Sequence, residues 1–205
     1  MPDESTRFLK EESRRLADEN RDLRQELQAL RESVRALSKL YYLSQHITPQ
    51  TDVLKLLQDI LDAAMAVLKA SDGSLMLMDE PTGELVFAVV RGLAADRLNG
   101  YRLPRGRGIA GSVAASRQPE VILDVRHDSR FYAAVDDAFG FRTRSMVCVP
   151  LVLDNNRVLG VIQIINKVSD RDFTQTDLDL MLIVAQLAAT AMRRAERAGE
   201  AGTQA

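Results

Sequence analysis

Hydrophobic residues recur every seven positions in the first forty residues of the chain, among mostly polar neighbours. A seven-residue apolar repeat puts one narrow stripe along a helix and is typical of a coiled coil. With the leucines at the d positions, the a positions are polar up to Asn20 and apolar from Leu27 onward. Asparagine at an a position favours a two-stranded, parallel register. The predicted dimer seam comprises Leu9, Leu16, Asn20, Leu23, Leu27, Leu30, Val34 and Leu37.

We therefore predict a parallel homodimeric coiled coil over residues 1–41, with a single solvated helix as the alternative. A 40-residue helix with one narrow apolar seam is marginal alone, which favours the partnered form. The helix should continue until Pro49 interrupts it. Thr51 can cap a second helix, whose apolar residues recur at helical spacing from Val53 to Leu68 and which should end by Gly73.

The spacing then changes to short apolar runs separated by turn residues. Strands are predicted at Ser74–Met78, Leu85–Val90, Tyr101–Leu103 and Val121–Leu123, and short helices at Ile109–Ser116 and Phe131–Phe139. Two longer runs rich in Val and Ile, Ser145–Leu153 and Val158–Asn166, flank a turn at residues 154–157 and predict a β-hairpin.

The last predicted helix, about Gln175 to Arg197, is apolar almost all round. Such a helix must be covered on more than one side, by a sheet and by a second subunit. The small, polar residues 199–205 are expected to form a disordered tail.

A short motif after the hairpin resembles a known family. Asn166, Lys167, Phe173 and Asp177 match the NKFDE pattern of cyclic-nucleotide-binding GAF domains, although Leu178 stands at the final glutamate. The segment 106–111 is similar to the Gly-x-Gly-Ile-Ala-Gly that begins a small helix in GAF domains. These glycines also fit the dinucleotide-binding pattern Gly-x-Gly-x-x-Gly. We reject that interpretation, because the segment before them is short and charged and is interrupted by Pro104.

The resemblance implies an α/β (α+β) fold over residues 42–198, with a central antiparallel sheet of about six strands, helices on one face and a pocket on the other. It also implies that the loop segment 124–144 closes over a bound molecule. The four motif residues are expected to form a structural clasp between the last strand and the last helix, with direct ligand contact as the alternative. Candidate ligand-binding residues are Leu75, Leu77, Phe87, Val89, Ile109, Val113, Asp124, His127, Phe131, Val135, Phe139, Ser145 and Val147.

The composition limits the partners, the cellular location and the metal sites to be expected of this chain. A net charge of −2 gives no electrostatic reason to expect nucleic acid. The polar N-terminus and the lack of an 18-residue apolar run predict a cytoplasmic protein without membrane contact. One cysteine, Cys148, excludes an internal disulfide, and together with two histidines it leaves little material for a metal site. We expect no metal.

The sequence contains no catalytic constellation, so we expect a non-catalytic protein. A GAF-type methionine-sulfoxide reductase would need more reactive cysteines than Cys148. The leading hypothesis is a dimeric regulatory module that senses a small ligand and signals to a partner protein in trans. Four arginines between residues 126 and 144 would suit an anion, so a cyclic nucleotide is the candidate ligand. The alternative is a ligand-free dimerisation scaffold or protein–protein adaptor.

Overall fold

The structure is a computed structural model that describes residues 4–45, 51–168 and 172–203. The chain divides into two compact units, residues 1–36 and 37–205. The division falls a few residues before the domain boundary expected from the sequence. No described helix combines the length and the apolar content needed to cross a membrane.

The first unit consists of the larger part of α1, a continuous helix from Glu4 to Gln45. Its d-position leucines at 9, 16, 23 and 30 are all more than half exposed. At the apolar a positions, Val34 and Tyr41 are also more than half exposed, and Leu27 is 47% exposed. The side chain of Leu37 and the residues around Pro49 lie outside the described part of the chain. An uncovered apolar stripe is what one strand of a coiled coil presents, and the coiled coil itself stays a prediction.

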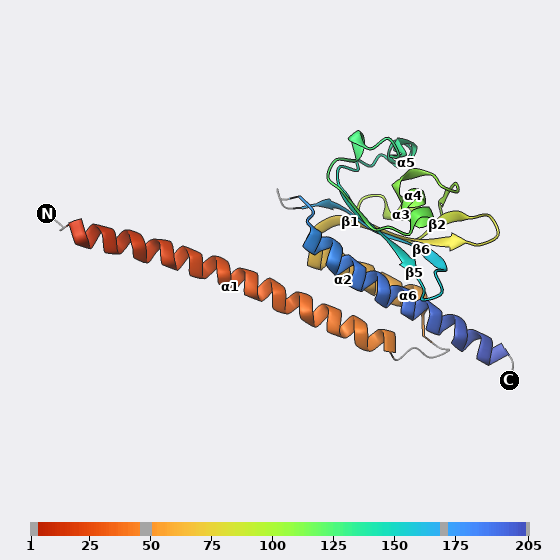
Figure 1. Ribbon diagram of the computed structural model, residues 1–205, viewed down its shortest axis with the longest axis horizontal. Helices are drawn as coiled ribbons and strands as arrows, with labels where there is room; N and C mark the ends of the chain where they lie inside the picture. The colour runs from red at the N-terminus through yellow and green to blue at the C-terminus, as the bar shows by residue number, and fades with distance from the viewer. Residues whose placement is uncertain (1–3, 46–50, 169–171, 204–205) are drawn as a thin grey trace. The chain divides into compact units, whose positions relative to one another are not determined.

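The second unit is organised around one six-stranded antiparallel sheet of order β3-β2-β1-β6-β5-β4 (Figure 1). The strands are β1 Ala70–Asp79, β2 Glu84–Arg91, β3 Arg102–Leu103, β4 Glu120–Ile122, β5 Met146–Val152 and β6 Val158–Lys167. The sequence prediction of about six antiparallel strands is confirmed. β5 and β6 form the predicted hairpin, and Asn156 takes the left-handed conformation, φ 64°, that its turn requires.

Two long helices cover one face of the sheet, α2 (Val53–Leu68) and α6 (Gln175–Thr203) (Figure 1). The cap of α2 is Asp52 and not the predicted Thr51, because the Asp52 carboxylate accepts a hydrogen bond from the Lys55 amide at 3.0 Å. α2 ends at Leu68, where Lys69 takes a left-handed conformation, and Gly73 already belongs to β1. α6 continues through Thr203, where the sequence analysis expects a disordered tail from residue 199.

Short elements cover the opposite face: α3 Ala95–Leu98, α4 Gly108–Ser116, the 3₁₀ turn η1 Val125–His127 and α5 Ala133–Phe139. The sheet is therefore buried on both sides and separates two apolar cores. α4 and α5 match predicted helices, whereas α3, a single turn, has no counterpart in the sequence analysis.

Candidate functional site

A cavity of about 90 Å³ lies between the sheet and the layer made by α3, α4 and α5. Its walls are mostly apolar. Methionine, phenylalanine and aliphatic side chains come from the sheet and from the covering layer, and polar groups are few. The polar and charged residues of the lining are Asp72, Ser74, Arg91, Tyr132, Asp136, Thr143 and Gln163.

Four of the predicted ligand-binding residues line this cavity: Phe87, Ile109, Phe131 and Val135. Val113 and Phe139 belong to the same core but do not line the cavity. Three of these four residues come from the covering layer, namely from α4, α5 and the loop before α5. Their role in ligand binding stays a prediction.

The strand residues need correction. Leu75, Val89 and Val147 are buried in the core beneath α2 and α6, and Leu77 packs against that same core. In β1 and β5 the side chains that face the cavity are those of the alternate residues, including Ser74, Met76 and Met146. The predicted pocket assignment of these four residues is wrong because it placed them on the wrong face of the sheet.

In β2 the error has a local cause. Phe87 and Val89 are two residues apart and would share a face in a regular strand. The pairing with β1 shifts between Leu75 and Met76, which face Val89 and Phe87 respectively, so Ala88 is an extra residue in β2. This β-bulge turns Phe87 toward the cavity and Val89 toward α2 and α6.

Asp124, His127 and Ser145 do not line the cavity either. The His127 side chain is 86% exposed, and its Nδ1 lies 2.8 Å from Asp124 Oδ2. A hydrogen bond from the Arg126 amide, followed by the contact with His127, lowers the pKa of Asp124. These contacts shape the turn η1 and leave Asp124 and His127 at the surface.

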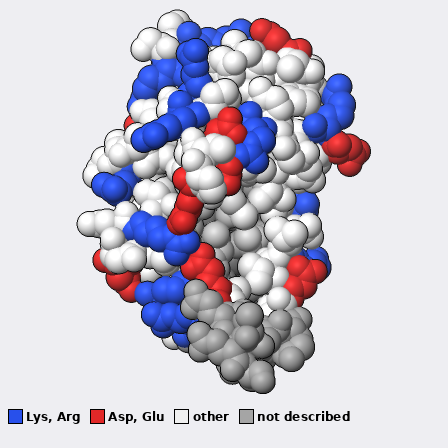
Figure 2. Space-filling view, turned by 90° about the vertical axis from the view of Figure 1, so that its right-hand side faces the viewer, with Lys and Arg blue, Asp and Glu red and all other residues white. Residues whose placement is uncertain are grey.

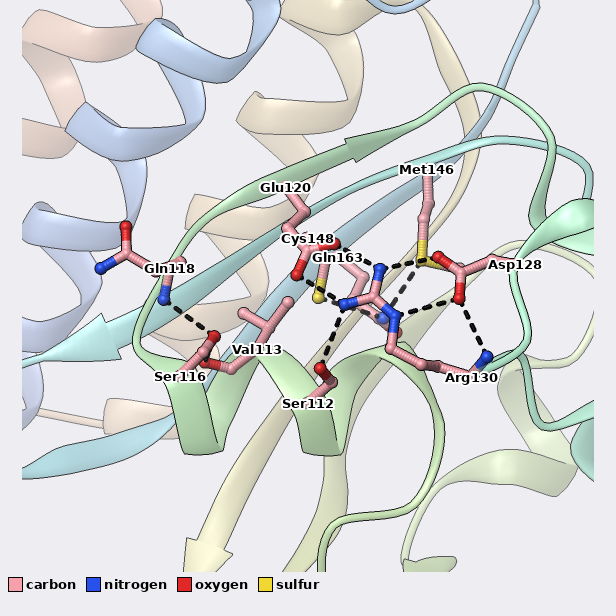
Figure 3. A network of polar contacts seen from close by, with 10 residues as sticks. All are labelled: Ser112, Val113, Ser116, Gln118, Glu120, Asp128, Arg130, Met146, Cys148 and Gln163. Atoms are coloured by element: carbon pink, nitrogen blue, oxygen red, sulfur yellow. Dashed lines mark hydrogen bonds and ion pairs between the residues drawn. The ribbon is translucent and has the colours of Figure 1, made fainter.

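The loop after η1 is tied down by the guanidinium of Arg130 (Figure 3). Arg130 binds Glu120 of β4 with both terminal nitrogens, at 2.7 and 2.5 Å, and it also reaches Ser112 of α4 at 3.1 Å. It contacts Asp128 at 2.7 and 3.0 Å and lowers the pKa of that carboxyl. One side chain thus joins the loop, the edge strand and α4, next to the cavity residue Phe131.

Two buried acids hold the neighbouring loops. Asp136 of α5 accepts hydrogen bonds from the amide and the hydroxyl of Thr143, both at 2.7 Å. Asp72 of β1 accepts one from the Leu93 amide at 3.1 Å and another from the Ser71 hydroxyl. Both carboxylates line the cavity, yet their oxygens are already occupied by the protein.

All four motif residues lie outside the cavity: Asn166 and Lys167 end β6, Phe173 precedes α6, and Asp177 lies in its first turn. Asn166 accepts from the Arg144 amide at 2.8 Å and donates to the Arg142 carbonyl at 2.9 Å. Lys167 Nζ lies 2.6 Å from Asp177 Oδ2, with both side chains mostly buried, and 5.4 Å from the ring centre of Phe173. These contacts connect β6 to the start of α6 and to the loop before β5.

Four polar residues of the cavity lining, Gln163, Ser74 and the two buried acids, were not among the predicted ligand-binding residues. Gln163 interrupts the apolar run of β6 and is 6% exposed, and Ser74 is its neighbour on β1. The sequence signal that could have identified Gln163 is a single polar residue inside an otherwise apolar strand. Among the described residues, no group of three or more His, Cys, Asp or Glu side chains is placed to hold a metal ion.

Cys148 lies on the cavity side of the sheet, fully buried, and burial raises the pKa of its thiol to about 12. A protonated, inaccessible thiol is a poor nucleophile. The geometry around Cys148 therefore offers no activated sulfur for covalent chemistry.

A six-stranded antiparallel sheet with two long helices on one face and a small covered cavity on the other defines an α/β domain with a candidate ligand cavity. The GAF domain family model matches residues 52–192, and the chain belongs to that family, whose members are regulatory, small-ligand-binding and generally non-catalytic modules.

Two solved structures show the likeness in three dimensions. The GAF domain of a phosphoenolpyruvate-protein phosphotransferase from Coxiella burnetii superposes with a TM-score of 0.72 at 18% identity, over 84% of this chain and 98% of that one. A free methionine-R-sulfoxide reductase from Neisseria meningitidis, solved with its substrate, gives 0.63 at 25% identity, over 82% and 91%.

A curated relative carries the same likeness in sequence. The dual 3′,5′-cyclic-AMP and -GMP phosphodiesterase 11 of Drosophila melanogaster is 29% identical in an alignment of 170 residues that covers 77% of this chain. The chain spans 12% of the length of that relative.

Proposed function

We propose that this chain is a regulatory module in which a small ligand enters the cavity beneath α3, α4 and α5 and alters the packing of α2 and α6. The observation that carries the proposal is the cavity itself, because one sheet separates it from the core under those helices. A ligand shifts such a packing equilibrium only as far as it binds one arrangement more tightly than the other.

The segment 124–144 is the part of the cover that would open and close. It contributes Phe131, Tyr132, Val135 and Phe141 to the cavity wall. Arg130 attaches it to β4 and α4 at one point, and Asp136 stiffens it internally. The apolar side chains of the cover also pack on the core at this face of the sheet, so an entering ligand has to replace the contacts that they lose when the cover opens.

A cyclic nucleotide is the ligand suggested by the name of the Drosophila relative. Pockets for molecules of that size measure roughly 300–1,000 Å³, so binding would require the cover to open. Isothermal titration of the full chain with cyclic AMP and cyclic GMP, up to millimolar concentration, tests this version. Saturable heat would support it, and its absence for both nucleotides would contradict it.

Dimerisation is the second part of the proposal and is supported by the exposed leucines of α1. Sedimentation equilibrium at micromolar concentration should give a dimer. The double variant Leu16→Glu/Leu23→Glu should give a monomer, because it places like charges in the seam. The matched control Arg14→Glu/Arg21→Glu changes positions outside the seam and should stay dimeric. A monomeric wild-type chain would contradict the dimer.

The exposed stripe also favours the second candidate function, a ligand-free dimerisation scaffold or adaptor. The two functions share a dimer but differ in the cavity, so ligand titration separates them. We propose that either one acts on a protein partner in trans, for which a pull-down with wild-type and seam variants is the direct test. On the face shown in Figure 2, basic and acidic side chains are interspersed, which does not favour nucleic acid as that partner.

A further inference from the structure

A row of polar side chains crosses the cavity face of the sheet. Ser74 of β1 pairs with Gln163 of β6, Gln163 pairs with Cys148 of β5, and Cys148 pairs with Glu120 of β4. Directly paired residues of neighbouring strands point to the same face, so the row is continuous. Ser74 and Gln163 lie on the floor of the cavity, and Glu120 ends the row at Arg130 (Figure 3).

The Gln163 amide has weak partners although it is buried. Its Nε2 donates to Met146 Sδ at 3.4 Å and to Cys148 Sγ at 3.3 Å, and its Oε1 accepts from Ser74 Oγ at 3.3 Å. Thioether and thiol sulfurs are weak acceptors, and a primary amide prefers oxygen. Because the amide lines the cavity, a ligand oxygen there would give it a stronger hydrogen bond than either sulfur does.

The charges around the cavity disfavour an anion. The charged residues of its lining are Asp72, Asp136 and Arg91. The Arg91 guanidinium is already paired with Asp62 of α2, at 2.6 Å from Nε, whereas both acids are buried. A negatively charged ligand would enter an apolar space beside two carboxylates, without a cation released to neutralise it.

The volume points to a small molecule. About 90 Å³ is less than the ~150 Å³ of an engineered apolar cavity that binds benzene. Two flexible methionines, Met76 and Met146, are part of the wall and can adjust to a ring. A compact, ring-sized molecule therefore fits with small side-chain movements, and a nucleotide does not.

We propose that Ser74 and Gln163 form the polar subsite of the cavity, which takes a compact, uncharged, mostly apolar molecule carrying one carbonyl, amide or hydroxyl group. The proposal rests on the proposed function, because it names the ligand class of the same cavity. It adds that the ligand is neutral and that the Gln163 amide recognises its oxygen.

Benzamide and benzoate are a suitable pair of probes, since they have the same shape and differ in charge. Titration of the full chain, followed by ¹H–¹⁵N NMR at millimolar probe concentration, should show saturable shifts with benzamide and weaker binding of benzoate. The near-isosteric variant Gln163→Met should raise the Kd of benzamide about fivefold, the value of one neutral hydrogen bond. Toluene, which cannot form that bond, should bind the wild type and Gln163→Met equally.

The matched control is Gln118→Met, the same exchange at an exposed residue outside the cavity, and it should leave every Kd unchanged. Tighter binding of benzoate, or an unchanged benzamide Kd in folded Gln163→Met, would overturn the neutral subsite. Saturable binding of cyclic AMP without binding of benzamide would overturn it as well, while the proposed function stands. If neither the probes nor the nucleotides bind, both the subsite and the proposed function fail.

Discussion

Replacing Arg130 with methionine removes the anchor of the cavity cover and keeps most of the side-chain volume. The lost contacts are the two-pronged pair with Glu120, the pair with Asp128 and the hydrogen bond to Ser112. The side chains of Arg130, Glu120 and Asp128 are 37%, 25% and 15% exposed, so solvent screens the network in part.

The magnitude follows from that partial exposure. Fully exposed ion pairs contribute about 0.2–1 kcal/mol each, and hydrogen bonds to charged groups about 1.5–3 kcal/mol when well shielded. Two pairs in intermediate surroundings, discounted for screening, should therefore contribute about 1–2 kcal/mol to the free energy of unfolding. For a domain of this size, that corresponds to a fall in Tm of roughly 2–8 °C.

Urea unfolding at fixed protein concentration gives the stability change, and hydrogen exchange gives its location. Faster exchange should be confined to amides of the segment 124–144 and of β4. Arg126→Met is the matched control. Its guanidinium has no ion pair among the described residues, so its stability should differ from wild type by less than about 0.5 kcal/mol.

The pH dependence provides an independent check. Arg130 holds the pKa of Asp128 below its ordinary value of 3.8 in the folded chain. The folded state therefore binds fewer protons than the unfolded state in this range, and the contribution of the pair is lost as pH falls through the lowered folded pKa. The difference between wild type and Arg130→Met should be constant from pH 7 to about pH 5 and should shrink below about pH 4. Equal stability of the two proteins at pH 7, or a difference that grows in acid, would refute the assignment of Arg130 as the anchor.

Three further outcomes are expected. The Cys148 thiol should resist an aromatic disulfide reagent at pH 8 in the folded chain and react with one equivalent in urea, because burial raises its pKa to about 12; rapid labelling of the folded protein would contradict this. Asp177→Asn should lower the free energy of unfolding by about 2–4 kcal/mol, since it leaves the mostly buried Lys167 without its carboxylate. The control Asp179→Asn, on the exposed side of α6, should have little effect on the urea midpoint. Gly160→Ala should lower the free energy of unfolding by about 3 kcal/mol or more, because its Cβ would lie 2.0 Å from the Met76 carbonyl oxygen. A Tm within about 2 °C of wild type, which corresponds to a loss of about 1 kcal/mol or less, would show that β1 and β6 can separate.

Local chemistry explains why the hairpin and the long helices were predictable. β5 and β6 are rich in β-branched residues, and the Asn-containing turn between them needs no information from elsewhere in the chain. The first residue of α2 was harder to predict, because Thr51 and Asp52 are both good N-cap residues and only the folded backbone selects between them. α3 consists of a single turn, too short for a periodic pattern.

The face of each strand was harder to predict, for a physical reason. A sheet buried on both sides carries apolar residues on both sides, so its strands read as continuous apolar runs without alternation. Leu75 and Met76 are adjacent apolar residues, yet they belong to different cores. The extra residue Ala88 then reversed the alternation within β2, and this depends on the pairing with β1. In such a sheet, isolated polar residues such as Gln163 identify the cavity face more reliably than the apolar ones do.

The position of Gln163 within β6 links the two halves of the domain at the scale of single peptide units. Its chain neighbours, Ile162 and Ile164, are completely buried in the core beneath α2 and α6, while Gln163 itself contacts the cavity. Protein interiors are close-packed, so a strand cannot move on one side without displacing atoms on the other. A molecule that pulls on the Gln163 side-chain amide therefore acts on the core residues beneath the long helices through one peptide unit in each direction, with no need for a relay of side chains.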